Sequence, residues 1–324
     1  MVLISEGKGI IIRDFLAGIV ISLLVFVFAA ASPLSASFLF FLSPLPIIYF
    51  YSKLGRIPGL LLVLATLVVA VFTLEMLHHG EYVPLICLLS YLGVILAEIL
   101  KRKVSIEKAI LSSLVAMMIP GLILITYSII KTGAAPWQRI EPYIVSAILE
   151  NVKLYSELGV PTEQVNLIKD NAQQIAVFFI NILPALGLVS MALCIWLNLL
   201  VTRMIFYRRR LSYPDFGDLA KWKSPEKLVW LVIASGGMLL IPNDRVYYVG
   251  LNLLILCLFV YLLQGLAIIS FFFRKKNIPV FMRTIFYVLL IFQQIFILLV
   301  VAVGLFDLWL DFRKFNKPMS GSAA

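Results

Sequence analysis

The stretch Asn252–Ser270, NLLILCLFVYLLQGLAIIS, decides the class of this protein. It is apolar over a length that crosses the ~30 Å hydrocarbon core of a bilayer as an α-helix, and the basic run Arg274–Lys276 follows it closely. The whole chain has this character: 62% of its 324 residues are hydrophobic, 14% are charged, and the mean hydropathy is +1.03. A soluble domain is about half apolar and about a quarter charged. The sequence therefore predicts an all-α fold, a polytopic transmembrane helical bundle.

Basic residues indicate the orientation of the bundle, because Lys and Arg accumulate in cytoplasmic loops. They precede the first apolar segment and follow the second, fourth, sixth and eighth, which predicts a cytoplasmic N-terminus. Nine crossings would place the basic tail (Arg313, Lys314, Lys317) outside. The second and seventh segments contain prolines or a Gly–Gly pair and are candidates for broken or re-entrant helices, so we predict eight or nine membrane helices. The nine candidate segments are 14–31, 34–52, 57–77, 82–100, 106–130, 174–202, 227–242, 246–273 and 279–306.

The segments divide the chain into four regions. Residues 1–130 form an N-terminal half with about five membrane helices, and residues 174–313 form a C-terminal half. Between them lies an external insertion, 131–173, in which apolar residues recur at helical spacing and predict an amphipathic helix. A second helical pattern begins at Thr162 and predicts one continuous helix to about residue 206. Residues 314–324 are predicted to be a disordered tail.

Two helices of the C-terminal half carry neutral amides. Gln174 and Asn181 are seven residues apart and share a helix face, and Pro184 bends that helix next to them. Such a face can line a polar pocket, although hydrogen bonds between helices are the structural alternative.

The opening stretch carries two further amides. Tyr261 and Gln264 share one side of their helix, and Gly265 lets a neighbouring helix approach. Asn252 lies about 120° away around an ideal helix and is predicted to tie its helix to a neighbour. The candidate substrate-binding residues are Gln264, Tyr261, Gln174, Asn181, Asn252, Glu98 and Gln293.

Charged residues suggest different roles. Glu98 is close enough to Lys101 on one helix to form an ion pair, and this is the structural alternative to a role in binding. Asp307, Asp311 and Arg313 predict an interfacial charge cluster, with cation binding as the alternative. A basic cytoplasmic loop is a candidate for partner docking through Arg208, Arg209, Arg210 and Trp222.

Several classes of function find no support. No nucleophile with a base, no multi-ligand metal pattern and no phosphate-binding loop occurs, so we expect no catalytic residues, no metal and no cofactor. The net charge of +10 follows from basic residues beside apolar runs, which favours anionic lipids and argues against nucleic acid as a partner. The three cysteines lie inside apolar segments and are interpreted as small apolar side chains.

The C-terminal third resembles the YybS-like family of bacterial membrane proteins, which implies the bacterial inner (cytoplasmic) membrane. That family is similar to the substrate-binding S components of energy-coupling-factor transporters. This implies a small-molecule ligand and a partner protein that supplies ATP hydrolysis. The resemblance rests on Trp222-xx-Pro225, Asn252, Tyr261-xx-Gln264-Gly265-Leu266-Ala267, Gly304-xx-Asp307-x-Trp309 and Asp311-Phe312-Arg313.

The leading functional hypothesis is an integral membrane protein that binds a small molecule or lipid in an intramembrane polar pocket, as a substrate-binding transporter subunit. A non-transporting scaffold or regulator that docks a protein partner is the alternative. A lipid-modifying membrane enzyme is the third hypothesis. The membrane lipids themselves are expected partners in every case.

Overall fold

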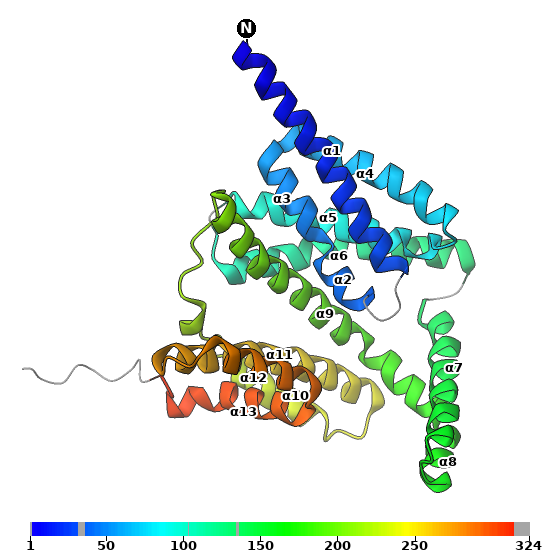
Figure 1. Ribbon diagram of the computed structural model, residues 1–324. Coiled ribbons are helices and arrows are strands. Elements are labelled where there is room, and N and C mark those ends of the chain that lie inside the picture. Colours follow the sequence, from blue (N-terminus) through cyan, green and yellow to red (C-terminus); the bar gives the residue numbers. More distant parts are fainter. Residues whose placement is uncertain (1, 32–35, 103, 134–135, 314–324) are drawn as a thin grey trace, which may run out of the picture. The chain divides into compact units, whose positions relative to one another are not determined.

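The computed structural model describes residues 2–31, 36–102, 104–133 and 136–313, and within these ranges every regular element is helical (Figure 1). The all-α fold predicted from the sequence is therefore confirmed. Two single 3₁₀ turns, Gly80–Tyr82 and Leu219–Lys221, accompany the α-helices. The α-helices are α1 (Val2–Ala31), α2 (Ala36–Leu42), α3 (Pro44–Leu54), α4 (Arg56–Met76), α5 (Val83–Leu100), α6 (Ile106–Thr132), α7 (Pro136–Glu157), α8 (Thr162–Asp170), α9 (Ala172–Arg209), α10 (Leu228–Met238), α11 (Asp244–Lys275), α12 (Val280–Phe292) and α13 (Gln294–Leu310).

Six helical stretches of the described chain are long and apolar enough to cross a membrane, and the bent pair α12–α13 raises the number to seven if it forms one span. The chain is thus a multi-pass helical membrane protein, but the predicted count of eight or nine is not confirmed. The six stretches are 11–31, 56–76, 80–100, 106–132, 172–209 and 244–275.

Breaks and short helices explain why the structure has fewer membrane-length helices than the eight or nine predicted. The second predicted segment is divided into α2 and α3, because Pro44 and Pro46 remove two helical N–H donors. The seventh contains only the 11 residues of α10. The ninth bends by 105° between its two helices. Continuous apolar sequence therefore does not correspond to one straight helix at these places.

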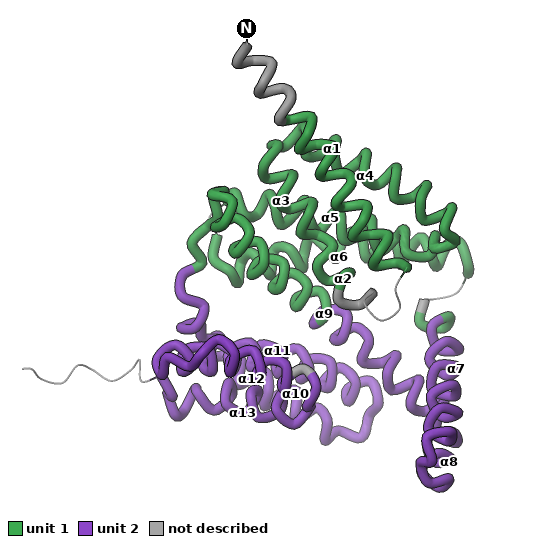
Figure 2. The backbone as a smooth tube through the Cα atoms, in the orientation of Figure 1, with its two compact units in different colours: residues 1–139, 190–216 green, residues 140–189, 217–324 purple. Residues whose placement is uncertain are grey.

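The chain folds as two compact units, coloured separately in Figure 2. Unit 1 contains residues 1–139 and 190–216, and unit 2 contains residues 140–189 and 217–324. The long helix α9 contributes one part to each unit.

Unit 1 has its core among α1, α3, α4 and α5. Phe26, Ile47 and Leu62 are completely buried there. Gly18 of α1 faces Phe50, whose Cγ would lie only 2.9 Å from a methyl group at the glycine. Apolar packing between closely approaching helices therefore holds this unit together.

Unit 2 begins with the insertion helices α7 and α8 and ends with α10–α13. The predicted continuous helix from 162 to about 206 is wrong, because α8 ends at Asp170 and α9 begins at Ala172. Asn171 between them leaves the helical conformation (φ −101°, ψ 10°), and its side-chain amide donates to the Leu167 carbonyl at 2.8 Å. An asparagine that bonds to its own backbone competes with helix continuation.

Candidate functional site

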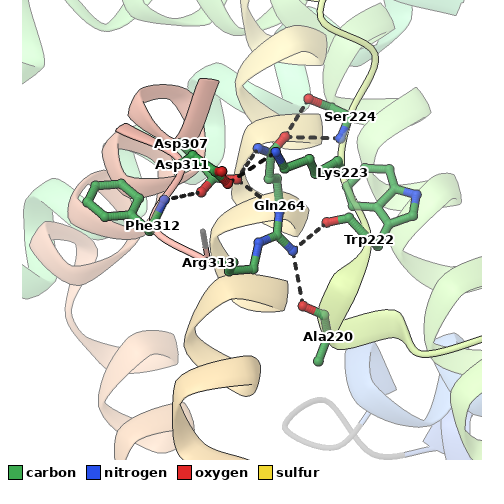
Figure 3. A network of polar contacts seen from close by, with 9 residues as sticks. All are labelled: Ala220, Trp222, Lys223, Ser224, Gln264, Asp307, Asp311, Phe312 and Arg313. Atoms are coloured by element: carbon green, nitrogen blue, oxygen red, sulfur yellow. Dashed lines mark hydrogen bonds and ion pairs between the residues drawn. The ribbon is translucent and has the colours of Figure 1, made fainter. Parts of the chain in front are cut away.

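The C-terminal end of α13 carries a buried ion pair. Arg313 Nη2 lies 2.9 Å from Asp307 Oδ2, and both side chains are 0% exposed. Asp307 also accepts hydrogen bonds from the Gln264 side-chain amide at 3.1 Å and from the Phe312 backbone N–H at 3.0 Å. Both carboxylate oxygens thus have partners, which a buried charge requires. Figure 3 shows these groups converging.

The same network binds the segment that precedes α10. Arg313 Nη1 donates to the carbonyl oxygens of Ala220 at 3.0 Å and Trp222 at 2.9 Å. Gln264 Oε1 accepts a hydrogen bond from the Ser224 backbone N–H at 3.0 Å and another from the Ser224 hydroxyl (Figure 3). One connected network therefore joins α11, the end of α13 and the extended chain before α10.

The chemistry of this network favours a structural junction over a ligand site. Gln264 is 3% exposed, its carboxamide oxygen already accepts two hydrogen bonds, and its amide nitrogen donates to Asp307. A ligand would have to displace these partners, and each lost bond at a buried polar group costs about 1–3 kcal/mol. We therefore interpret the network as a fixed anchor between helices.

Two glycines let α11 and α13 approach each other closely beside this anchor. A methyl group at Gly265 would overlap the Val300 carbonyl oxygen, and one at Gly304 would overlap the Tyr261 carbonyl oxygen. Tyr261 is 2% exposed in the same contact. The predicted close approach at Gly265 is present, and Gly304 is its counterpart on α13.

A second feature of unit 2 is an open groove of about 760 Å³ between α9 and α11. Apolar side chains form part of its wall, and charged, amide and phenol groups form the rest. Its volume lies within the roughly 300–1,000 Å³ of small-molecule sites. The groove is lined by Val177, Asn181, Pro184, Asp244, Arg245, Tyr248, Val249, Asn252 and Leu253.

Asn252 lines this groove and connects its two helices. Its Oδ1 accepts from the Ala185 backbone N–H at 2.9 Å, and its Nδ2 donates to the Asn181 carbonyl at 2.8 Å. In a regular helix Ala185 N–H and Asn181 C=O would bond to each other. The carboxamide therefore bridges α9 next to the bend-forming Pro184, and the predicted tie between helices is present.

The other predicted pocket residues lie apart from one another. Gln174 is exposed on α9, and Gln293 is exposed at the break between α12 and α13. Glu98 belongs to unit 1, where it bonds to Arg56 and Lys101 at 2.8 and 2.7 Å. The structure thus brings together two pairs, Asn181 with Asn252 in the groove and Tyr261 with Gln264 in the anchor.

The charged candidates also separate into distinct environments. The Asp311 side chain is 20% exposed, unlike the buried pair, and forms an ion pair with Lys223 at 3.4 Å. In unit 1, Arg208, Arg209 and Arg210 are all exposed at the end of α9. The loop after them is anchored by Tyr213, whose hydroxyl donates to the Leu199 carbonyl at 2.8 Å. Burial raises the pKa of Tyr213 above its ordinary value, so the hydroxyl remains a donor even in moderately alkaline solution.

Sequence reasoning missed one amide that resembles Asn252 in its role. Asn198 of α9 donates to the Phe41 carbonyl at 2.6 Å, at the break between α2 and α3. Pro44 and Pro46 were the available signal, because prolines favour a break between helices and the last carbonyls of the helix that ends there lack helical donors. The contributions of Ser224 and Arg245 were also missed, since helical periodicity does not show which distant segments meet.

Metal ligands do not gather in the part of the chain that the structure describes, where no group of three or more His, Cys, Asp or Glu side chains could hold an ion. The three free cysteines Cys87, Cys194 and Cys257 lie on α5, α9 and α11.

The model of a family described as predicted membrane protein (DUF2232) matches residues 20–308. No curated protein and no solved structure matches the chain.

Proposed function

We propose a binding function for this chain, which belongs to the DUF2232 family of predicted membrane proteins. In this proposal the α9–α11 groove takes up a small amphipathic molecule or a lipid. The site lies in the bacterial inner membrane, with the N-terminus of the chain in the cytoplasm. The basic residues beside alternate apolar segments support this orientation.

The mixed lining of the groove is the observation that carries the proposal. Pro184, Val249 and Leu253 offer apolar surface, while Asp244 and Arg245 offer charge beside them. In the described residues neither the Asp244 carboxylate nor the Arg245 guanidinium forms a hydrogen bond or ion pair, so both are available to a ligand. A molecule with an apolar body and a polar head matches this combination, because pocket specificity comes from a few polar groups on apolar walls.

Filling the groove tests the proposal. Val249 lines it and is 52% exposed, so Val249→Trp is expected to occupy the ligand space without disturbing a buried core. Affinity for a dansylated fatty acid should fall by at least about tenfold, or roughly 1.4 kcal/mol. Native mass spectrometry of the purified protein should show a matching loss of any retained small molecule.

The control variant is Ile233→Trp, because Ile233 is 57% exposed on α10 and does not line the groove. It should bind the dansylated fatty acid as the wild type does. Undiminished binding by Val249→Trp, or no saturable binding by the wild-type chain, would contradict the proposal.

A transporter role extends this proposal. The resemblance to S components implies that the chain presents its ligand to a partner that hydrolyses ATP. Affinity purification from bacterial membranes in mild detergent should then recover an ATP-hydrolysing protein in constant ratio to the chain. Recovery of the chain with its small molecule but without such a partner would leave the binding function and remove the transporter role.

A further inference from the structure

The position of the segment before α10 indicates which end of α11 lies near a membrane surface. Asp218 pairs with Arg274 at 2.8 Å, and Ser224 bonds to Gln264 ten residues earlier on α11. Further along, α10 approaches Gly250, where a methyl group would meet Met238 Cβ at 2.6 Å. The chain from 217 to 239 therefore runs antiparallel to α11 and starts beside its C-terminal end.

The beginning of this segment, beside the C-terminal end of α11, lies outside the hydrocarbon core. The segment beside the C-terminal part of α11 carries charged and exposed residues, and charges facing lipid in the bilayer centre are costly. The remaining part of α11, from Gln264 back to Asp244, is roughly 30 Å long at 1.5 Å per residue, enough for one crossing. The exposed charged residues are Lys221, Lys223, Glu226 and Lys227.

The C-terminal end of α13 lies at the same level. Arg313 donates to the carbonyls of Ala220 and Trp222, and Asp311 pairs with Lys223. Three contacts between separate residues thus place the end of the helix beside the segment before α10.

The beginning of α12 also lies at this level, just beyond the end of α11. Arg283 donates through Nε to the Ile278 carbonyl at 2.8 Å and through Nη2 to the Phe273 carbonyl at 3.3 Å. The Phe273 ring contacts the ring of Phe286 at a centroid distance of 5.4 Å. The middle of α12 therefore remains beside the C-terminal end of α11.

We propose that α12 and α13 form a re-entrant pair, which enters and leaves the membrane on the face where the segment before α10 lies. The 13 residues of α12 are roughly 20 Å long, short of a full crossing, and the chain turns by 105° before α13. The contacts of α13 with Tyr261, Gln264 and Gly265 fall on the C-terminal half of α11.

This arrangement removes the conflict between nine crossings, which would place the basic C-terminal end outside, and the positive-inside rule. With α12–α13 re-entrant, with α2–α3 counted as one crossing, and with the whole chain from 224 to 243 crossing alongside α11, the chain crosses eight times. The C-terminal end of α13, with Arg313, then lies on the same side as the other basic loops, as the positive-inside rule expects.

Cysteine accessibility tests the proposal in the full-length protein. In a variant with Cys87, Cys194 and Cys257 replaced by alanine, single cysteines are placed at Lys221, at Leu240 beyond α10, or after the last residue. Intact cells and permeabilised cells are treated with a membrane-impermeant maleimide. The C-terminal cysteine is expected to label under the same condition as Lys221→Cys and under the opposite condition to Leu240→Cys, which is 85% exposed in the wild type.

Reporter fusions to the unchanged chain provide an independent measurement. If the segment before α10 is cytoplasmic, a C-terminal green fluorescent protein should fluoresce and a C-terminal alkaline phosphatase should be inactive. An active phosphatase fusion together with a cytoplasmic Lys221→Cys, or labelling of the C-terminal cysteine together with Leu240→Cys, would overturn the proposal and make α12–α13 a true crossing.

Discussion

Asp307→Leu is expected to lower the free energy of unfolding by about 3–5 kcal/mol, because it leaves the Arg313 guanidinium as an uncompensated buried charge. Both side chains of this pair are 0% exposed, so water cannot replace the missing carboxylate. The same change removes the acceptor of the Gln264 amide. The apparent melting temperature of the detergent-purified protein should fall by on the order of 10 °C.

Two further variants make this prediction specific. Asp311→Asn removes a neighbouring carboxylate whose side chain is 20% exposed in its pair with Lys223, and it should cost less than about 1 kcal/mol. Asparagine also tolerates the left-handed backbone at this position (φ +37°). The double variant Asp307→Leu/Arg313→Met should be more stable than Asp307→Leu alone, since it has no unpaired charge. Equal melting temperatures for Asp307→Leu and Asp311→Asn would contradict the importance of the buried pair.

Three side-chain amides show what the sequence could and could not reveal. Asn252 bridges α9 next to Pro184, Asn198 bonds to the break before Pro44, and Gln264 binds Ser224, which precedes Pro225. Proline bends or breaks the helix around it, and backbone groups beside such an irregularity need partners in an apolar medium. An amide supplies both a donor and an acceptor without charge, which explains why amides occur in these apolar helices.

The helical periodicity predicts which of these residues share a side of a helix. It places Tyr261 near Gln264 and separates both from Asn252, and the structure agrees. It does not predict which segment supplies the partner. Ser224 lies 40 residues from Gln264, and an extended chain before a short helix gives no periodic signal. The anchor around Asp307 and Gln264 therefore could not be predicted from the sequence, although several of its residues were candidate site residues.

The count of membrane crossings could not be fixed from the sequence for a similar physical reason. Hydropathy reports how apolar a segment is, and it is insensitive to the breaks that shorten a helix. The second and ninth segments are mainly apolar, yet one contains the break between α2 and α3 and the other bends by 105°. Pro44 and Pro46 predict the break between α2 and α3. The Gln293–Gln294 pair at the bend between α12 and α13 is not a recognised helix breaker.

Gly304→Ala is expected to destabilise the protein by about 1–3 kcal/mol, because the added methyl group would overlap the Tyr261 carbonyl oxygen. Backbone atoms of a packed helix cannot move aside as a flexible side chain can, so α13 must shift away from α11. That shift would also lengthen the bond between Gln264 and Asp307, which is 3.1 Å in the native contact. The effect of Gly304→Ala should therefore be less than additive with that of Asp307→Leu, as expected for residues that support one contact.

Gly187→Ala supplies the matched control for this prediction. Gly187 lies within α9, and a methyl group there meets no atom within 4 Å. Alanine stabilises a helix interior by roughly 0.5–1 kcal/mol relative to glycine, so this variant should melt at or slightly above the wild-type temperature. Since the helix-propensity gain applies equally to both glycines, the difference between the two variants isolates the cost of the contact with Tyr261. If Gly304→Ala melts as high as Gly187→Ala, α11 and α13 do not pack through their glycines. The explanation that this close approach holds Asp307 beside Gln264 would then be wrong.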